Sequence, residues 1–264
     1  MSILTKITNY KRENEIPQAM EKTPLDEMKA RAAAAPPALD FIAALRRERG
    51  VSLIAEIKQA SPSKGVLTDH FDPLELAGLY SANGAAAISI LTDEPFFQGH
   101  LDILALVREH YPAMPLLRKD FIIHPYQIYE ARAYGADAIL LITAILPPDE
   151  LQALLSLSQS LGMAALVETH NRQELESALS VRPSLVGINN RNLNDFSVNI
   201  ETCLSLRGQV PPEICCVSES GIHSVEDMHR MASARVDAVL VGEALITADD
   251  PASKIKELSD AGKS

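Results

Sequence analysis

The stretch "PLLRKDFIIHPYQIYEARAYGADAILLI", residues 115–142, contains the pattern that repeats along the chain and decides the fold. It begins with an apolar run that ends in three consecutive charges, Arg-Lys-Asp at 118–120. A helical pattern that begins at a proline follows at 125–136, and a second apolar run closes the stretch. Short, nearly continuous apolar runs separated by amphipathic segments are typical of parallel strands that are buried on both faces and joined by helices.

Eight such apolar runs occur along the chain, and their starts are 21 to 34 residues apart, which leaves room for a strand, a helix and two loops in each repeat. The runs span residues 51–58, 85–92, 115–121, 136–142, 163–170, 184–190, 214–220 and 237–243. Eight strand–helix units in 264 residues predict an α/β fold, specifically a (β/α)8 TIM barrel. A doubly wound open sheet is the alternative, but the regular spacing and the absence of G-x-G-x-x-G after the first run favour closure.

Residues 1–48 precede the first strand and do not follow this pattern. The segment "PLDEMKARAAAAPPALDFIAALRRERG", residues 24–50, is helical in character and is interrupted at Pro36 and Pro37. We therefore expect an N-terminal helical extension over 1–48 and a catalytic barrel over 49–264. From these residues alone, the extension fits equally well as a plug at the bottom of the barrel or as a cap over the active-site end.

Composition restricts the classes of partner. The formal net charge of −11 argues against broad nucleic-acid binding but is compatible with a small anionic ligand held by a few converging basic side chains. The three cysteines form no C-x-x-C pattern, and the N-terminus has no long apolar segment of the signal-peptide type. No stretch is long and apolar enough to span a bilayer. We expect a cytoplasmic protein without a membrane partner.

Charged and polar residues gather where the predicted strands end. In a (β/α)8 barrel the C-terminal ends of the strands and the loops that follow them form the active site. Glu56 and Lys58 are two residues apart and so point to the same side of their strand, where unpaired charges would be costly unless they are used. Lys119 and Glu168 end two other strands, and opposed lysine and glutamate groups in one cleft shift each other's proton affinity. Any one of these residues by itself is more typical of a solvated rim charge, but their joint occurrence on three strands predicts acid–base chemistry.

Two glycines indicate where an anion binds. Gly221 and Gly242 follow the seventh and eighth predicted strands, where barrels often hold phosphate. Glycine permits close approach of the backbone, and helix N-termini supply free N–H groups.

Metal and nucleophile chemistry receive little support from the sequence. The seven histidines show no H-x-x-x-H or H-x-H spacing, and His170, which follows a strand end, is interpreted as structural or as supporting a catalytic residue. Cys215 and Cys216 lie within an apolar run, as core residues do. We expect neither a metal nor a cofactor.

The motifs "IAEIKQASPSKG", "LLRKDFIIHPYQIYEARAYGADAILLI", "LVETHN", "GINNRNL", "VSESGI" and "VLVGEAL" closely resemble the indole-3-glycerol phosphate synthase family of tryptophan biosynthesis. The resemblance spans all eight strand–helix units and includes the extension, through "YKRENE" and "PPALDFIAAL". Gln59, His124 and Asn192 depart from the family's usual residues, at positions outside the expected chemistry.

The resemblance implies a reaction and assigns roles. The substrate would be 1-(2-carboxyphenylamino)-1-deoxyribulose 5-phosphate, whose aryl carbon attacks the ribulose carbonyl before carbon dioxide and water are lost. Lys119 would be the general acid of ring closure and Glu168 the general base of dehydration. Glu56 and Lys58 would position substrate and acid, with Lys58 as a second acid. The substrate-binding residues implied by the resemblance and by the strand ends are Ser61, Ser63, Phe97, Asn189, Arg191, Glu219, Ser220, Gly221, Gly242 and Glu243.

The resemblance also places the extension over the barrel mouth, where we expect Phe41, Ile42, Leu45 and the basic pair Arg46-Arg47 to enclose the substrate. No obligatory protein partner is evident. Two other functions remain open from the residues alone, a sugar-phosphate isomerase or epimerase and a barrel that serves only as a binding scaffold. The first would need carboxylates, a thiol or metal ligands where this chain has lysine, and the second has no use for opposed acid and base.

Overall fold

The computed structural model describes residues 2–46, 50–68, 70–193 and 195–263. Eight parallel strands form a closed barrel in the order β1-β10-β9-β8-β7-β6-β5-β4. The strands are β1 Ser52–Ile57, β4 Ala87–Leu91, β5 Leu116–Lys119, β6 Ala138–Ile142, β7 Ala164–Thr169, β8 Leu185–Asn189, β9 Cys215–Glu219 and β10 Ala238–Val241. Each lies inside one of the eight predicted apolar runs, so the barrel is confirmed and the open-sheet alternative is wrong.

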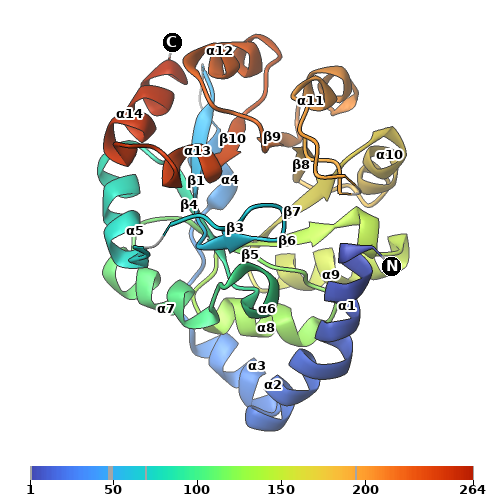
Figure 1. The fold of residues 1–264 in the computed structure, drawn as a ribbon. Coiled ribbons are helices and arrows are strands. Elements are labelled where there is room, and N and C mark those ends of the chain that lie inside the picture. The colour runs from blue at the N-terminus through green and yellow to red at the C-terminus, as the bar shows by residue number, and fades with distance from the viewer. Residues whose placement is uncertain (1, 47–49, 69, 194, 264) are drawn as a thin grey trace.

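Helices surround the strands (Figure 1). They are α5 Pro73–Ala82, α7 Leu101–His110, α8 Pro125–Ala133, α9 Pro148–Ser160, α10 Arg172–Ser180, α11 Glu201–Leu206, α12 Val225–Ser233 and α14 Pro251–Ala261. Several begin at side-chain caps, as at His124 and Ser224, whose side chains accept from backbone N–H groups of the first turn. Among the described residues no helix is long and apolar enough to cross a membrane.

Short elements that the sequence did not predict follow the strands. A hairpin of β2 Ala60–Ser61 and β3 Gly65–Val66 comes after β1, and the helices α6 Glu94–Phe97 and α13 Glu243–Ile246 come after β4 and β10. Short 3-10 turns cover Thr143–Ile145 and Arg207–Gln209. The hairpin, α6, α13 and the turn Thr143–Ile145 follow strands and add side chains to the loops of the barrel mouth, whereas the turn Arg207–Gln209 follows α11 and precedes β9.

Alternation along the strands separates two apolar cores. One lies between strands and helices, and the other fills the barrel interior with inward residues such as Ile54, Leu117 and Leu166. Cys215 belongs to the interior and Cys216 to the outer core, and both are fully buried, as the sequence predicted for core residues.

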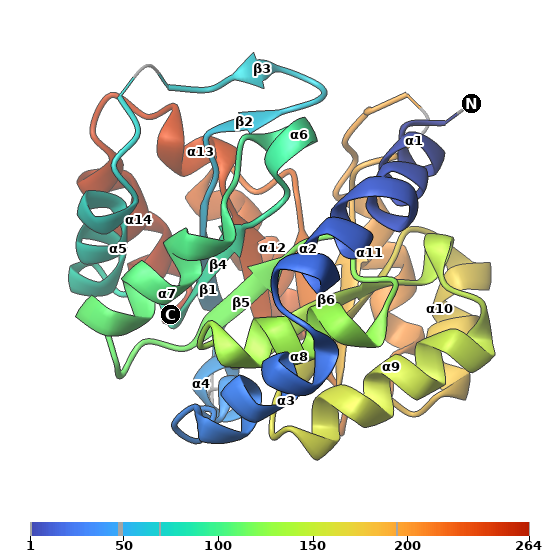
Figure 2. The same ribbon diagram turned by 90° about the horizontal axis from the view of Figure 1, so that it is seen from below.

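The extension consists of α1 Ile3–Tyr10, a π-helical turn at Lys11–Glu15, α2 Ile16–Lys22, α3 Leu25–Ala34 and α4 Phe41–Leu45. Its parts lie at opposite ends of the barrel, as Figure 2 shows for α1, near the β2–β3 hairpin, and α4, on the far side. The predicted boundary at residue 48 falls within 47–49, outside the described residues.

The expectation that Phe41, Ile42 and Leu45 enclose the substrate is wrong. Phe41 and Leu45 are buried in the barrel interior with residues that begin their strands, such as Ala87 and Leu185, so α4 plugs the bottom. Ile42 packs against the same cluster, and Arg46 donates to the carbonyl of Glu213, which precedes β9. Arg47 lies outside the described residues. The apolar residues before β1 fill the barrel because the strand starts leave an uncovered aliphatic interior there.

Candidate active site

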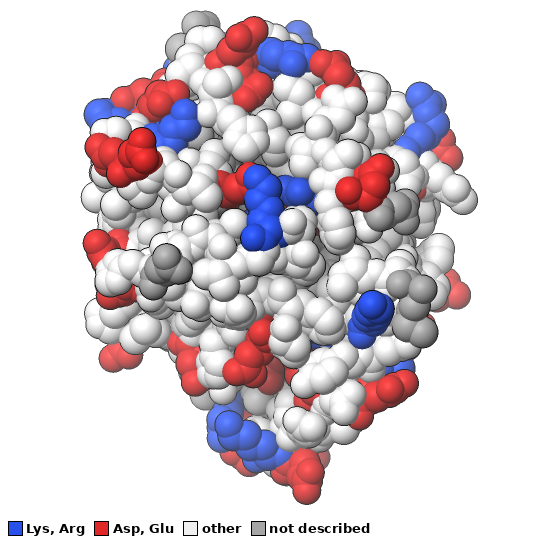
Figure 3. All heavy atoms as spheres, in the orientation of Figure 1, with Lys and Arg blue, Asp and Glu red and all other residues white. Residues whose placement is uncertain are grey.

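A cavity of about 410 Å³ opens at the C-terminal ends of the barrel strands. On the face that Figure 3 shows, basic side chains gather near the centre, over this end of the barrel. The basic residues lining the cavity are Lys58, Lys64, Lys119 and Arg191. A cavity of this size with a few converging charges in an apolar lining is typical of a small-molecule site.

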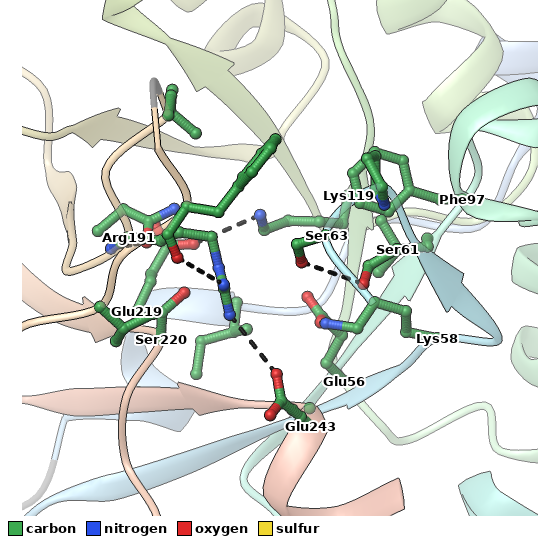
Figure 4. A pocket seen from close by; sticks show the side chains of 18 of the residues that line it. Glu56, Lys58, Ser61, Ser63, Phe97, Lys119, Arg191, Glu219, Ser220 and Glu243 are labelled. Carbon is green, nitrogen blue, oxygen red and sulfur yellow. Dashed lines mark hydrogen bonds and ion pairs between the residues drawn. The ribbon is translucent and has the colours of Figure 1, made fainter. Parts of the chain in front are cut away.

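Lys119 is the last residue of β5, and its Nζ atom points toward two carboxylates in the cavity (Figure 4). Nζ lies 3.4 Å from Oε2 of Glu168 and 3.5 Å from Oε2 of Glu219. Burial by itself would lower the pKa of Lys119, but the charges of Glu168 and Glu219 outweigh it and raise that pKa well above its usual range. The lysine is therefore a protonated group held between two acids.

The two glutamates differ in protonation. Burial opposes ionisation of Glu168, but Lys119 and His170 together outweigh it and hold the pKa of Glu168 well below its usual range. Burial and the charge of Glu168 raise the pKa of Glu219 to about 8. Glu219 is therefore largely protonated at neutral pH, beside an ionised Glu168. Environments that push two carboxyl groups apart in pKa are typical of catalytic sites.

Gly187 makes room for this pair. It lies on β8 beside Glu168, and a Cβ atom at its position would lie 2.2 Å from Oε1 of Glu219. Sequence reasoning missed Gly187, because a glycine inside an apolar run does not reveal which neighbouring side chain needs the space.

Glu56 and Lys58 form a second charged pair at the end of β1. Lys58 Nζ lies 2.6 Å from Oε1 of Glu56, and both side chains line the cavity, which confirms that they point to the same side. Burial would raise the pKa of Glu56, but the charges of Lys58 and Lys119 together outweigh burial and lower it. A Cβ atom at Gly242 would lie 2.5 Å from Oε1 of Glu56, so that glycine is required where Glu56 packs.

His170 contacts the carboxylate oxygen of the candidate general base, Glu168, that Lys119 does not contact. Its Nε2 lies 3.2 Å from Oε1 of Glu168, and its Nδ1 lies 2.9 Å from Oε2 of Glu174. Burial would lower the pKa of His170, but hydrogen bonds to the two glutamates raise it to about 10. The imidazolium thus fixes the position of the Glu168 carboxylate through its contact with Oε1.

The other side of the cavity carries hydroxyl and basic groups. Oγ of Ser61 and Oγ of Ser63 are 3.4 Å apart on the hairpin. Arg191 lies 3.6 Å from Glu243, which also pairs with Lys64. Figure 4 shows the Arg191–Glu243 pair across the cavity from Lys119.

An apolar wall completes the cavity. Phe97, at the end of α6, packs against Phe121 with ring centroids 5.8 Å apart. Ile3, Leu4 and Ile7 of α1 add aliphatic surface at the mouth. We identified Phe97 from the sequence but missed Phe121 and α1. Phe121 directly follows the charged Arg-Lys-Asp motif, and this position was a signal that could have identified it. The mouth is covered by the first helix of the extension and not by the segment directly before β1.

All fourteen residues predicted for the site line this one cavity. Asn189 ends β8, and its Oδ1 accepts from the backbone of Arg191. Ser220 and Gly221 both have positive φ, 65° and 83°, in the turn after β9. Among the described residues, no three His, Cys, Asp or Glu side chains group as metal ligands would.

The sequence matches the family model described as indole-3-glycerol phosphate synthase over residues 4–258. A relative of that name from Roseiflexus castenholzii (strain DSM 13941 / HLO8) is 53% identical over 264 residues, covering 97% of this chain and 98% of the relative. One from Dehalococcoides mccartyi (strain CBDB1) is 55% identical over 212 residues, covering 80% and 82%. One from Polaromonas naphthalenivorans (strain CJ2) is 50% identical over 259 residues, covering 97% and 98%.

Solved structures agree on the architecture. 3-Hexulose-6-phosphate synthase from Salmonella typhimurium superposes with a TM-score of 0.66 at 14% identity, covering 80% of this chain and 98% of that one. This likeness shows the barrel fold alone. With the family match over nearly the whole length and relatives at about half identity, the chain belongs to the indole-3-glycerol phosphate synthase family.

Proposed function

We propose that the charged residues of the cavity have separate catalytic roles. The reaction that this chain catalyses is the decarboxylating ring closure that forms indole-3-glycerol phosphate in tryptophan biosynthesis. Lys119 is the general acid of ring closure, Glu168 is the general base of dehydration, and Lys58 is the acid that assists the departure of water. The main support for the proposal is the position of Lys119, whose Nζ lies 3.4 Å from Oε2 of Glu168 and 3.5 Å from Oε2 of Glu219.

Ring closure comes first. The aryl carbon that bears the carboxylate attacks the ribulose carbonyl carbon, and the carbonyl oxygen takes a proton from Lys119 as the new carbon–carbon bond forms. The high pKa of Lys119 keeps the ammonium protonated until an alkoxide-like oxygen develops beside it. A preorganised cation in a largely buried site stabilises that developing charge more strongly than water does.

Decarboxylation follows because the aryl ring has lost its aromaticity. The carbon–carboxylate bond breaks, carbon dioxide leaves, and its electron pair restores the six-membered ring. Phe97 and Phe121 form the apolar wall against which that ring packs. Asn189 holds the sugar hydroxyls or the carboxylate at the end of β8.

Dehydration completes the indole. The hydroxyl made from the carbonyl oxygen leaves as water with a proton from Lys58, assisted by the ring nitrogen. Glu168 then removes the proton from the adjacent carbon, which forms the ring double bond. Glu168 suits this role because Lys119 and His170 keep it ionised, and Glu56 orients Lys58 through their 2.6 Å contact.

The phosphate binds near the turns that follow β9 and β10. Ser63 and the backbone at Gly221 and Gly242 contact it, Ser61 and Ser220 line the same side, and Arg191 and Lys64 supply positive charge. Glu243 orients those two basic side chains. The fit of the glycines to a phosphate site is a proposal that rests on their place after β9 and β10.

The test is conversion of 1-(2-carboxyphenylamino)-1-deoxyribulose 5-phosphate by the purified protein, followed by indole fluorescence and carbon dioxide release. We expect one carbon dioxide per indole ring, without added cofactor or metal, and a much poorer reaction with the dephosphorylated analogue. Absence of both products from well-folded protein would refute the proposal. A cytoplasmic location and independence from a protein partner are further proposals, testable by fractionation and by activity of the isolated chain.

A further inference from the structure

The side chain of Lys11 is completely buried, although it belongs to the N-terminal extension. Its Nζ lies 2.6 Å from Oδ1 of Asp120, 3.1 Å from Oδ2 of Asp93 and 2.8 Å from Oε1 of Glu15. Burial would lower the pKa of Lys11, but Asp120 and Asp93 outweigh it and raise that pKa well above its usual range. An ammonium is removed from water at a cost of several kcal/mol, on the order of what its partners return, so a site of this kind needs an explanation other than stability.

The two aspartates lie at the ends of neighbouring strands, and each holds one aromatic wall of the active site. Asp93 caps α6 by accepting from the N–H of Phe96 at 2.9 Å, and α6 ends in Phe97. Asp120 directly follows Lys119 and accepts from the N–H of Phe121 at 2.8 Å.

Asp120 is satisfied by the barrel alone, but Asp93 is not. Arg118 and Thr92 donate to Oδ2 of Asp120, at 3.0 Å and 2.6 Å. Oδ2 of Asp93 is buried, and among the described residues its one close cation is Lys11. Burial raises the pKa of Asp93. Lys11 therefore supplies the charge that joins the end of β4 to the end of β5.

The backbone of the extension is irregular at this residue. The N–H of Ile16 bonds to the carbonyl of Lys11, which makes the five-residue turn Lys11–Glu15 π-helical. Single π turns within α-helices occur frequently at functional sites. Here the turn begins at the residue whose side chain reaches Asp93 and Asp120.

We propose that Lys11 is a positioning residue, which fixes the relative places of α6 and the end of β5 so that Phe97 and Phe121 form the aryl-binding wall next to Lys119. This inference rests on the proposed function, since it assigns the wall to the aryl ring. Lys11 touches no substrate and acts only through Asp93 and Asp120.

The expected signature separates positioning from stability. Lys11→Met keeps the length of the side chain and removes the charge. We expect KM for the aminodeoxyribulose phosphate to rise by about tenfold or more and kcat to fall by about 10²-fold, the scale that a misplacement of about 1 Å produces. Competition by inorganic phosphate should not change, because the phosphate side does not involve these aspartates. The control is Lys6→Met, an exposed lysine on α1, which should leave all values unchanged.

A second variant keeps the test decisive where Lys11→Met folds poorly. Lys11→Met with Asp93→Asn removes the unpaired buried carboxylate, so it should regain much of the lost melting temperature while KM and kcat stay impaired. Kinetics are measured well below each melting temperature. Wild-type KM and kcat in the double variant, or in a folded Lys11→Met, would overturn the proposal, as would equal weakening of inorganic phosphate binding.

The outcome is distinguishable from a failure of the proposed function. If the wild-type chain binds the aminodeoxyribulose phosphate without forming indole, the proposed function fails. Calorimetric affinity of the same compound for wild type and Lys11→Met then judges Lys11 independently, with unchanged affinity counting against it.

Discussion

Replacing Lys119 with methionine removes the proposed general acid while keeping most of the volume and apolar character of the side chain. Loss of a general acid typically reduces the rate by about 10²–10⁴-fold, which is about 3–5 kcal/mol of transition-state free energy. Because Lys119 also lies between Glu168 and Glu219, the expected loss in kcat falls at the upper end of that range.

The same substitution changes stability. It leaves two buried carboxyl groups without their shared cation, and breaking a buried ion pair by removing one partner costs about 3–5 kcal/mol. Proton sharing by Glu219, whose pKa is already about 8 beside Lys119, reduces that cost at neutral pH and below. The melting temperature of Lys119→Met should therefore fall most above pH 8. Adding Glu219→Gln should restore part of the stability but none of the turnover.

The assay follows indole fluorescence with saturating substrate at a temperature where wild type and variant are both folded. Lys256→Met, at an exposed position of α14, is the matched control and should behave as wild type. A kcat for Lys119→Met within about threefold of wild type, well short of the usual range for a general acid, would refute the role assigned to Lys119.

Three further outcomes follow from the geometry. The pKa of His170 is raised from 6.5 to about 10, so its contribution to stability is complete below pH 6.5 and is lost as pH rises through 10. The free energy of unfolding of His170→Gln should therefore fall less steeply than that of wild type between these pH values, with a difference of at most about 5 kcal/mol. Identical pH slopes for the two proteins would contradict the ion pair with Glu168. Gly187→Ala places Cβ 2.2 Å from Oε1 of Glu219, so kcat should fall while competition by inorganic phosphate is kept, and an unchanged kcat would show that Glu219 has room to move. Gly242→Val should displace Glu56, and a pH–rate profile identical to wild type would contradict this.

The barrel and most of the site could be predicted because they depend on local pattern. Apolar runs that recur every 21 to 34 residues mark the strands, and strand alternation places Glu56 and Lys58 on one side. Residues such as Lys119 and Glu168 are recognisable because an unpaired charge at the end of a buried strand costs free energy. Such a charge therefore indicates a functional role.

What the sequence could not reveal depends on contacts between distant segments. Lys11 and Asp120 are more than a hundred residues apart, and only the folded chain brings them together. Phe41 and Leu45 were expected at the mouth because they precede β1. In the structure they pack into the barrel interior at the end where the strands begin, which is the end nearest to them in the chain. Gly242 was interpreted as a phosphate contact, whereas its lack of a side chain also accommodates Glu56.

The division of roles between Lys119 and Glu168 is tested most directly by a single turnover of Glu168→Gln, with carbon dioxide and indole followed in the same sample. We expect carbon dioxide to appear within about an order of magnitude of the wild-type rate, because ring closure needs only Lys119, while indole forms about 10²-fold or more slowly. Carbon dioxide release that is slowed as much as indole formation would place Glu168 in ring closure and contradict the proposed mechanism.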